Sequence, residues 1–323
     1  MSIRYGSRSR PGTMVSTWLN GLVSGNVPGI PAGYFAGGTV SGVVATIDKF
    51  AFSDDGRTTL GTGLSAARRA LAGAANSDTA AYFAGGFATA NVDTVDKFAF
   101  SGDVRTTLGT GLSSARASLA GAANSGTAAY FAGGETTTSV ATVDKFAFSD
   151  DGRTTLGTGL SVARHFLAGA ANSGTAAYIA GGFDNSAGAN KTTVDKFAFS
   201  DDGRTTLGTG LSSATRGLAG AANSGTAAYF AGGNSGGAVT TVDKFAFSDD
   251  GRTTLGTGLS AAKYYLGGLA NSGTAAYFAG GGNGAVVTTV NKFAFSDDGR
   301  TTLGTGLSAA TNLLAGAANA GTL

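Results

Sequence analysis

One seven-residue phrase recurs along this chain at an almost constant interval. AAYFAGG occurs four times, and the variants AGYFAGG and AAYIAGG occur once each. The copies are separated by 48, 48, 48, 51 and 48 residues, measured between Tyr34, Tyr82, Tyr130, Tyr178, Tyr229 and Tyr277. A fixed period of this length is typical of solenoids, propellers and arrays. The repeat therefore predicts one body of six equal units over residues 31–323, although 323 residues could by length alone make two domains.

Turn-forming residues divide each unit into four short stretches. In residues 116–160, the sequences NSG, Gly-Gly and SDDG separate SLAGAAN, TAAYFAGG, VATVDKFAF and RTTLGTGL. Asn, Ser, Asp and Gly favour tight turns, and four short strands at this spacing are typical of an all-β meander. An Ala-rich helix over SSARASLAGAAN would instead give a β/α solenoid. Its interior glycine disfavours that helix by about 1 kcal/mol.

The size of the side chains in the four stretches favours a radial arrangement. LAGAAN is almost entirely Ala, Gly and Asn, whereas DKFAF carries two Phe. We expect the small residues at a crowded axis and the Phe side chains where the sheets diverge. This predicts an all-β fold, a six-bladed β-propeller of four-stranded antiparallel blades. The chain enters at a second strand and ends after a first strand within 313–323, so the C-terminal strand is expected to join the N-terminal blade and remove an exposed edge.

The unit resembles the kelch repeat. That family has an Arg before a small-residue strand, then a strand that ends in Gly-Gly, then two further strands. Here Arg116, LAGAAN, YFAGG, DKFAF and RTTLGTGL occupy those places. The chain departs from the pattern where Leu156 replaces the fourth-strand Trp and where Thr215, Lys263 and Thr311 replace the Arg. The phrases AGAANSGTAAYFAGG and DKFAF with RTTLGTGLSSAR also look like those of kelch-like virion or tail-fibre proteins of bacteriophages. The resemblance implies a propeller and a role on a virus particle.

The six internal copies agree in some connections and differ in others. The turns NSG and SDDGR are nearly constant, whereas the loops after Gly-Gly vary, and so do the three-residue segments shortly before each first strand. We call these segments the triplets; they are residues 68–70, 116–118, 164–166, 215–217, 263–265 and 311–313. In an antiparallel blade the variable connections share one face of the disc. Such loops often carry function on a rigid scaffold, and drift without any ligand is the alternative. The predicted ligand-binding or partner-binding face consists of Arg68, Arg69, Arg116, Arg164, His165, Phe166, Arg216, Lys263, Tyr264, Tyr265 and Asn312. Its aromatic rings suit stacking on sugars, and its arginines suit binding of carboxylates or sulfates.

The composition argues against several functions. The chain has no Cys and one His, which excludes thiol catalysis, Cys-bound metals and the Cys- and His-containing copper site of kelch-fold oxidases. The two carboxylates of SDDG are too few for a calcium site. A net charge of +2 does not predict a nucleic-acid partner. No continuous apolar run of about 18 residues is present, so no membrane insertion is expected. We expect no enzyme activity, no metal and no cofactor.

Residues 1–30 precede the array and contain no acidic residue. They carry the only Trp of the chain beside several apolar residues, which favours an anchor that docks into another subunit. An unanchored terminal tail is the alternative. The residues expected to make the anchoring contacts are Arg4, Arg8, Arg10, Trp18, Leu19 and Leu22.

The sequence and the resemblance together predict a non-enzymatic bacteriophage virion structural protein, such as a fibre, tail or surface decoration protein. It would be made in the host cytoplasm and carried on the extracellular particle. Its expected partners are other virion proteins, through residues 1–30, and a host surface glycan or receptor, through the variable face. A cellular kelch-type protein-interaction module is the alternative hypothesis, and a glycan-active enzyme is a third.

Overall fold

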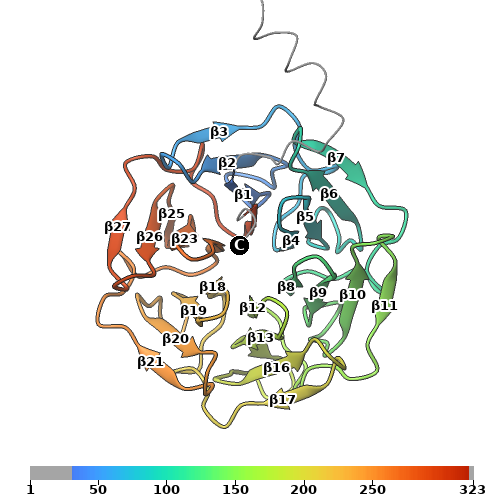
Figure 1. Cartoon of the computed structure of the whole chain (residues 1–323), viewed down its shortest axis with the longest axis vertical. Coiled ribbons are helices and arrows are strands. Elements are labelled where there is room, and N and C mark those ends of the chain that lie inside the picture. The colour runs from blue at the N-terminus through green and yellow to red at the C-terminus, as the bar shows by residue number, and fades with distance from the viewer. Residues whose placement is uncertain (1–30, 320–323) are drawn as a thin grey trace, which may run out of the picture.

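Six four-stranded antiparallel sheets surround a common axis in a computed structural model that describes residues 31–319 (Figure 1). Every named element in that range is a strand. The small-residue first strand of each sheet, LAGAAN in five blades and LGGLAN in the sixth, lies nearest the axis and the RTT strand lies at the rim. The predicted all-β, six-bladed propeller is confirmed. The predicted anchoring residues, Arg4, Arg8, Arg10, Trp18, Leu19 and Leu22, lie outside the described residues.

The blades follow one another along the chain. The first contains β28 (Ala315–Asn319), β1 (Ala32–Ala36), β2 (Ile47–Ala51) and β3 (Arg57–Thr59). The second contains β4 (Ala72–Asn76), β5 (Ala80–Ala84), β6 (Val95–Ala99) and β7 (Val104–Thr107). The third contains β8 (Ala120–Asn124), β9 (Ala128–Ala132), β10 (Val143–Ala147) and β11 (Arg153–Thr155).

The remaining blades repeat this order. The fourth contains β12 (Ala168–Asn172), β13 (Ala176–Ala180), β16 (Val194–Ala198) and β17 (Arg204–Thr206). The fifth contains β18 (Ala219–Asn223), β19 (Ala227–Ala231), β20 (Val242–Ala246) and β21 (Arg252–Thr254). The sixth contains β22 (Gly267–Asn271), β23 (Ala275–Ala279), β26 (Val290–Ala294) and β27 (Arg300–Thr302). Two short hairpins add β14 (Phe183–Asp184) with β15 (Ala189–Asn190), and β24 (Gly282–Asn283) with β25 (Ala285–Val286).

The two ends of the array close the ring. Strand β28 pairs antiparallel with β1 over five residue pairs, from Ala32 opposite Asn319 to Ala36 opposite Ala315. On its other sides β28 contacts the inner strands β22 and β4, so the six inner strands form an unbroken circle. The predicted closure of the first blade by the C-terminal strand is therefore confirmed.

Glycine at one position of each inner strand permits the close approach of the blades at the axis. A Cβ atom on Gly169 of β12 would lie 2.2 Å from the carbonyl oxygen of Gly121 in β8, and Gly121 stands in the same relation to Gly73 in β4. The same contact continues around the ring through Gly220, Gly268 and Gly316. The small residues predicted at the axis are thus required there by contact between backbones.

Buried side chains fill the wedges between neighbouring blades. In one cluster, Tyr82 and Val95 of the second blade pack with Phe131 and Phe146 of the third. Equivalent clusters occur at the other blade interfaces. Each buried Phe side chain contributes about 1.5–3 kcal/mol to folding. The second and third strands of each blade therefore hold most of the apolar core.

The fourth strand is shorter and more exposed than the sequence predicts. Strand β11 covers three residues, Arg153–Thr155, all of them exposed, and Leu156 already belongs to the connection toward the next blade. Only one side of this strand has a neighbouring strand, because it lies at the rim of the sheet. The expectation of a full strand over RTTLGTGL is wrong for that reason.

Candidate ligand-binding face

The variable connections lie together on one face of the disc. The middle residue of each triplet before a first strand pairs with the residue that follows Gly-Gly in the same blade. These bridges are Arg69 with Phe87, Ala117 with Glu135, His165 with Phe183, Arg216 with Asn234, Tyr264 with Gly282, and Asn312 with Thr39. We call the surface formed by the triplets and the loops after Gly-Gly the variable face.

A closed ring of backbone hydrogen bonds surrounds the axis at this face. The third residue of each triplet donates its N–H to the carbonyl of the equivalent residue one blade back, for example Phe166 to Ser118 at 2.8 Å. The six members are Ala70, Ser118, Phe166, Gly217, Tyr265 and Leu313. All six have positive φ, between 55° and 65°. The ring fixes the backbone of the triplets, so the mouth of the axis is rigid.

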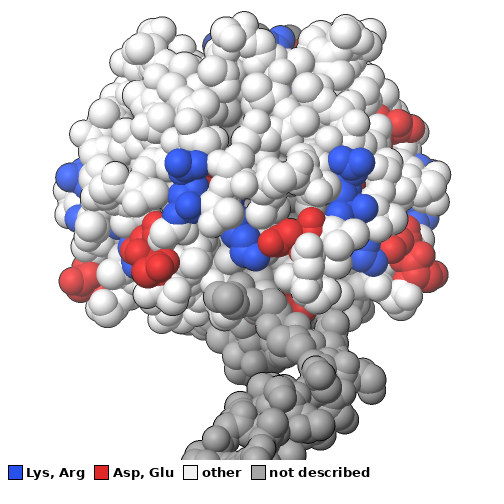
Figure 2. All heavy atoms as spheres, turned by 90° about the horizontal axis from the view of Figure 1, so that it is seen from above, with Lys and Arg blue, Asp and Glu red and all other residues white. Residues whose placement is uncertain are grey.

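The constant turns form the opposite face and the rim. The hydroxyl of Tyr130 donates to Asp202 in the SDDG turn of the next blade at 2.7 Å, and Lys145 binds the same carboxylate at 2.9 Å. The same bridge occurs at every blade interface, including Tyr277 to Asp55 across the closure. Figure 2 shows basic and acidic groups side by side in a band across the edge of the disc that faces the viewer. The constant residues of the repeat therefore join blade to blade.

A second set of constant contacts lies at the NSG turns. The side-chain oxygen of Asn124 accepts the N–H of Gly174 one blade further, at 2.8 Å. The hydroxyl of Ser173 accepts the N–H of Ser125 at 3.1 Å. These contacts explain why the turn sequence does not vary.

Five of the predicted face residues are buried, namely Lys263, His165 and three arginines. Arg68, Arg116 and Arg164 are 0% exposed. Each pairs with a buried carboxylate at 2.7–2.9 Å, in the pairs Arg68–Asp96, Arg116–Asp144 and Arg164–Asp195. The expectation that they bind an external carboxylate or sulfate is corrected, because each guanidinium already holds an internal one. Their role is to attach the incoming connection to its blade.

The carboxylate in this pair is held by more than the arginine. Asp144 accepts hydrogen bonds from the N–H and hydroxyl of Ser113 and from the hydroxyl of Thr155, at 2.6–2.9 Å. Burial raises the pKa of Asp144, but the bonds from Thr155 and Ser113 and the charge of Arg116 outweigh it and leave the pKa below its usual value.

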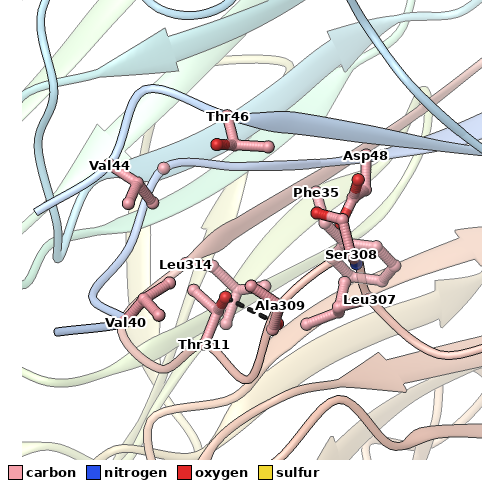
Figure 3. Close-up of a pocket in the computed structure, with 11 residues that line it drawn as sticks. Phe35, Val40, Val44, Thr46, Asp48, Leu307, Ser308, Ala309, Thr311 and Leu314 are labelled. Carbon is pink, nitrogen blue, oxygen red and sulfur yellow. Dashed lines mark hydrogen bonds between the residues drawn. The ribbon is translucent and has the colours of Figure 1, made fainter.

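In the last three units this arginine is replaced. Thr215 and Thr311 turn their hydroxyls to the carbonyls of Ser213 and Ala309, both at 2.9 Å. Figure 3 shows a pocket at the closure of the ring that Thr311 lines, with Thr311 directed to Ala309 and Asp48 bound to Ser308. Lys263 takes the place in the sixth blade and is 2% exposed.

Aromatic side chains gather at the mouth of the axis. The ring centroids of Phe166 and Tyr265 are 4.8 Å apart, although these residues belong to connections two blades apart. Gly217 lies between them, and its missing side chain leaves the space that the Tyr265 ring occupies. His165 and Tyr264 extend the group, at 4.7 Å from Phe166 and 4.8 Å from Tyr265. We call these four side chains the aromatic cluster.

The two remaining arginines of the predicted face stack on rings. Arg69 lies over Phe87 at 5.1 Å, and Arg216 lies over Phe183 at 4.8 Å. Both are partly exposed, so each can contact a ligand while its position is fixed by the ring beneath it. Asn312 is also partly exposed, and its backbone pairs with Thr39. Sequence reasoning missed Phe87 and Phe183; the signal was a Phe directly after Gly-Gly in two of the six loops.

His165 lies in a polar group that sequence reasoning also missed. Its Nδ1 is 2.9 Å from the hydroxyl of Ser139, and its Nε2 is 3.9 Å from a carboxylate oxygen of Glu135. Burial, helped by the charge of Arg216 and opposed by Glu135, holds the pKa of His165 below its usual value. The Ser139 hydroxyl is buried and also contacts the carbonyl of Phe183 and the N–H of Asn185, both at 3.3 Å. These contacts orient the imidazole and leave the hydroxyl inaccessible as a nucleophile.

Comparisons with known proteins add no assignment, since no protein-family model and no curated protein matches the chain. Within residues 31–319, no group of three or more His, Cys, Asp or Glu side chains is placed to hold a metal ion. No helix long and apolar enough to cross a membrane occurs in the same range. The structure thus defines a repeat protein, a six-bladed β-propeller with one constant and one variable face.

Proposed function

We propose that this chain is a non-enzymatic recognition protein whose variable face binds a carbohydrate on a host surface. The observation that carries the proposal is that departures from sixfold repetition concentrate on one face, where partly exposed rings gather at the axis. The ring face of an aromatic side chain is negatively polarised and attracts the C–H groups of a pyranose. Phe166, Tyr264 and Tyr265 are each partly exposed and provide such faces side by side.

The rigidity of the mouth supports this proposal. The backbone of Phe166 and Tyr265 belongs to the hydrogen-bonded ring, so little conformational entropy would be lost when these side chains bind a ligand. Arg216 lies at the edge of the same area, and its charge acts on both His165 and Tyr265. It would donate hydrogen bonds to hydroxyl or carboxylate groups of the sugar. The buried state of Ser139 and His165 favours binding over hydrolysis.

The kelch-type relationship and the placement on a bacteriophage particle rest on the resemblance of the repeated phrases. In this proposal residues 1–30 attach the propeller to another virion subunit and the variable face points away from the particle. Detection of the chain in purified particles would support it. Recovery only in complexes with cytoplasmic proteins would favour the cellular interaction module instead.

A glycan array tests the binding function. The double variant Tyr264→Ala/Tyr265→Ala should lose binding by about tenfold or more, because it removes two adjoining rings. The control Tyr264→Phe/Tyr265→Phe keeps both rings and should retain most of the affinity. Undiminished binding by the alanine variant would remove these residues from the site.

A further inference from the structure

One buried position of the repeat lacks its counter-ion in the sixth blade. In three units an Arg pairs with a buried Asp, as in Arg116 with Asp144 at 2.9 Å. In the sixth blade the corresponding residues are Lys263 and Asn291, so a basic side chain is kept and its carboxylate is replaced by an amide. No other unit combines a base with an amide here.

The amide does not compensate for the missing charge. The side-chain oxygen of Asn291 accepts the N–H and hydroxyl of Ser260, both at 3.1 Å, and its NH₂ donates to Thr302 at 3.0 Å. Lys263 Nζ donates to one carbonyl, that of Thr289, at the long distance of 3.4 Å. Within residues 31–319 no carboxylate lies within 4.0 Å of this ammonium group. Burial lowers the pKa of Lys263 to about 8, so the side chain still carries a charge at neutral pH.

Lys263 is one of the residues that line a cavity. The volume of this cavity is ≈ 370 Å³, within the range of small-molecule sites. Lys263 and Thr289, the residue that accepts its hydrogen bond, both line the cavity. The hairpin of β24 and β25 forms one side, through Gly282, Asn283 and Ala285. Asn283 and Ala285 are exposed, so the cavity opens on the variable face.

We propose that this cavity binds a small organic carboxylate, which supplies the negative charge that the Asp provides in other units. The ammonium group of Lys263 would donate charge-assisted hydrogen bonds to the carboxylate oxygens. Ala261, Ala285 and Val287 offer apolar contact to the carbon skeleton. The inference goes beyond the proposed carbohydrate recognition, because it requires no contact with the aromatic cluster.

Acetate and its neutral isostere acetamide test the proposal on the full chain. The side-chain NMR signals of Lys263 are followed during titration at constant ionic strength, with chloride as the balancing anion. Acetate should give a saturable shift in the wild-type protein, and acetamide should not. Asn291→Asp restores the internal counter-ion and should weaken acetate binding by about tenfold or more, while it leaves Lys263 in place.

A second variant keeps the result interpretable. Lys263→Arg/Asn291→Asp recreates the pair found in three other units, and it should fold and bind no acetate. Because neither variant changes Phe166, Tyr264 or Tyr265, a loss of acetate binding does not depend on carbohydrate recognition. Absence of a saturable acetate shift, equal acetate binding by Asn291→Asp, or equal binding of acetamide would overturn the proposal.

Discussion

Replacement of one axial glycine tests how tightly the six blades meet. In Gly169→Ala, the added Cβ would lie 2.2 Å from the carbonyl oxygen of Gly121 and 2.9 Å from its carbonyl carbon. Real contacts of this kind stay above about 3.0 Å, so the two inner strands must separate by about 0.8 Å. Both atoms belong to backbone, and Gly121 is held by the same contact to Gly73 on its other side. The strain therefore cannot be relieved by turning a side chain.

We expect Gly169→Ala to lower the free energy of unfolding by about 2–3 kcal/mol, the upper part of the range for overpacked cores. The assay is the midpoint of urea unfolding, followed by the tyrosine signal of the wedges. The matched control is Gly157→Ala in the adjoining connection, where a Cβ would meet no atom within 4 Å. That change should stay within about 0.5 kcal/mol of wild type. Equal midpoints for the two variants would refute the close contact of the inner strands.

Three further predictions concern buried polar groups. Tyr130→Phe removes the hydrogen bond to Asp202 and should lower the free energy of unfolding by about 1 kcal/mol in urea unfolding; an unchanged midpoint would argue against the bridge. Burial and the bond to Asp298 raise the pKa of Tyr229 to about 12, and the pKa values of the equivalent tyrosines shift the same way. A tyrosine in the unfolded chain ionises at about pH 10, so the stabilisation from these raised pKa values is complete below that pH and should be lost as the pH rises toward 12. The urea unfolding midpoints at about pH 9 and 11 test this. Lys263 has a lowered pKa, so its charge destabilises the fold, because between pH about 8 and 10.5 the unfolded chain binds a proton that the folded chain does not. Lys263→Met should therefore raise the free energy of unfolding at pH 7 by about 2–3 kcal/mol. A destabilised variant would contradict the burial of an unpaired ammonium group.

The fold could be predicted from the repeat because the residues of each strand indicate where that strand lies in the blade. The glycine of LAGAAN indicates the axis, the Tyr and Phe of the second and third strands indicate the wedges, and the incomplete first unit indicates the closure. The short outer strand was not predictable in the same way. Its length depends on how far β11 stays beside β10 at the edge of the sheet, and the glycines of RTTLGTGL, at 157 and 159, do not by themselves show that the strand ends as early as Thr155.

The candidate site was only partly predictable, because burial cannot be read from variability. Arg116 is the first residue of its triplet and Arg69 is the middle residue of another. Arg116 is buried against Asp144, whereas Arg69 lies on the ring of Phe87. The buried arginine could have been recognised by comparing the first triplet residue with the third strand of the same unit. Wherever the first triplet residue is Arg, an Asp follows about 28–31 residues later, whereas Lys263 is followed by Asn291. The contact between Phe166 and Tyr265 needs the ring geometry, since the two are two blades apart.

The pairing of β28 with β1 is the contact on which the closed ring depends, and one cross-link measures it directly. The chain has no Cys, so Ala36→Cys/Ala315→Cys introduces a single pair at positions that lie opposite each other. Opposed residues of antiparallel strands are about 4.5–5.5 Å apart between Cα atoms, within the reach of a disulfide. In the control Ala36→Cys/Ala318→Cys the second position lies opposite Gly33, three residues away along the strand.

Oxidation should convert the first variant into a monomeric cyclic form that migrates faster on a non-reducing gel, and it should leave the control uncyclised. Disulfide-linked dimers without the cyclic monomer, or equal cyclisation of both variants, would contradict a ring closed by the last strand beside the first.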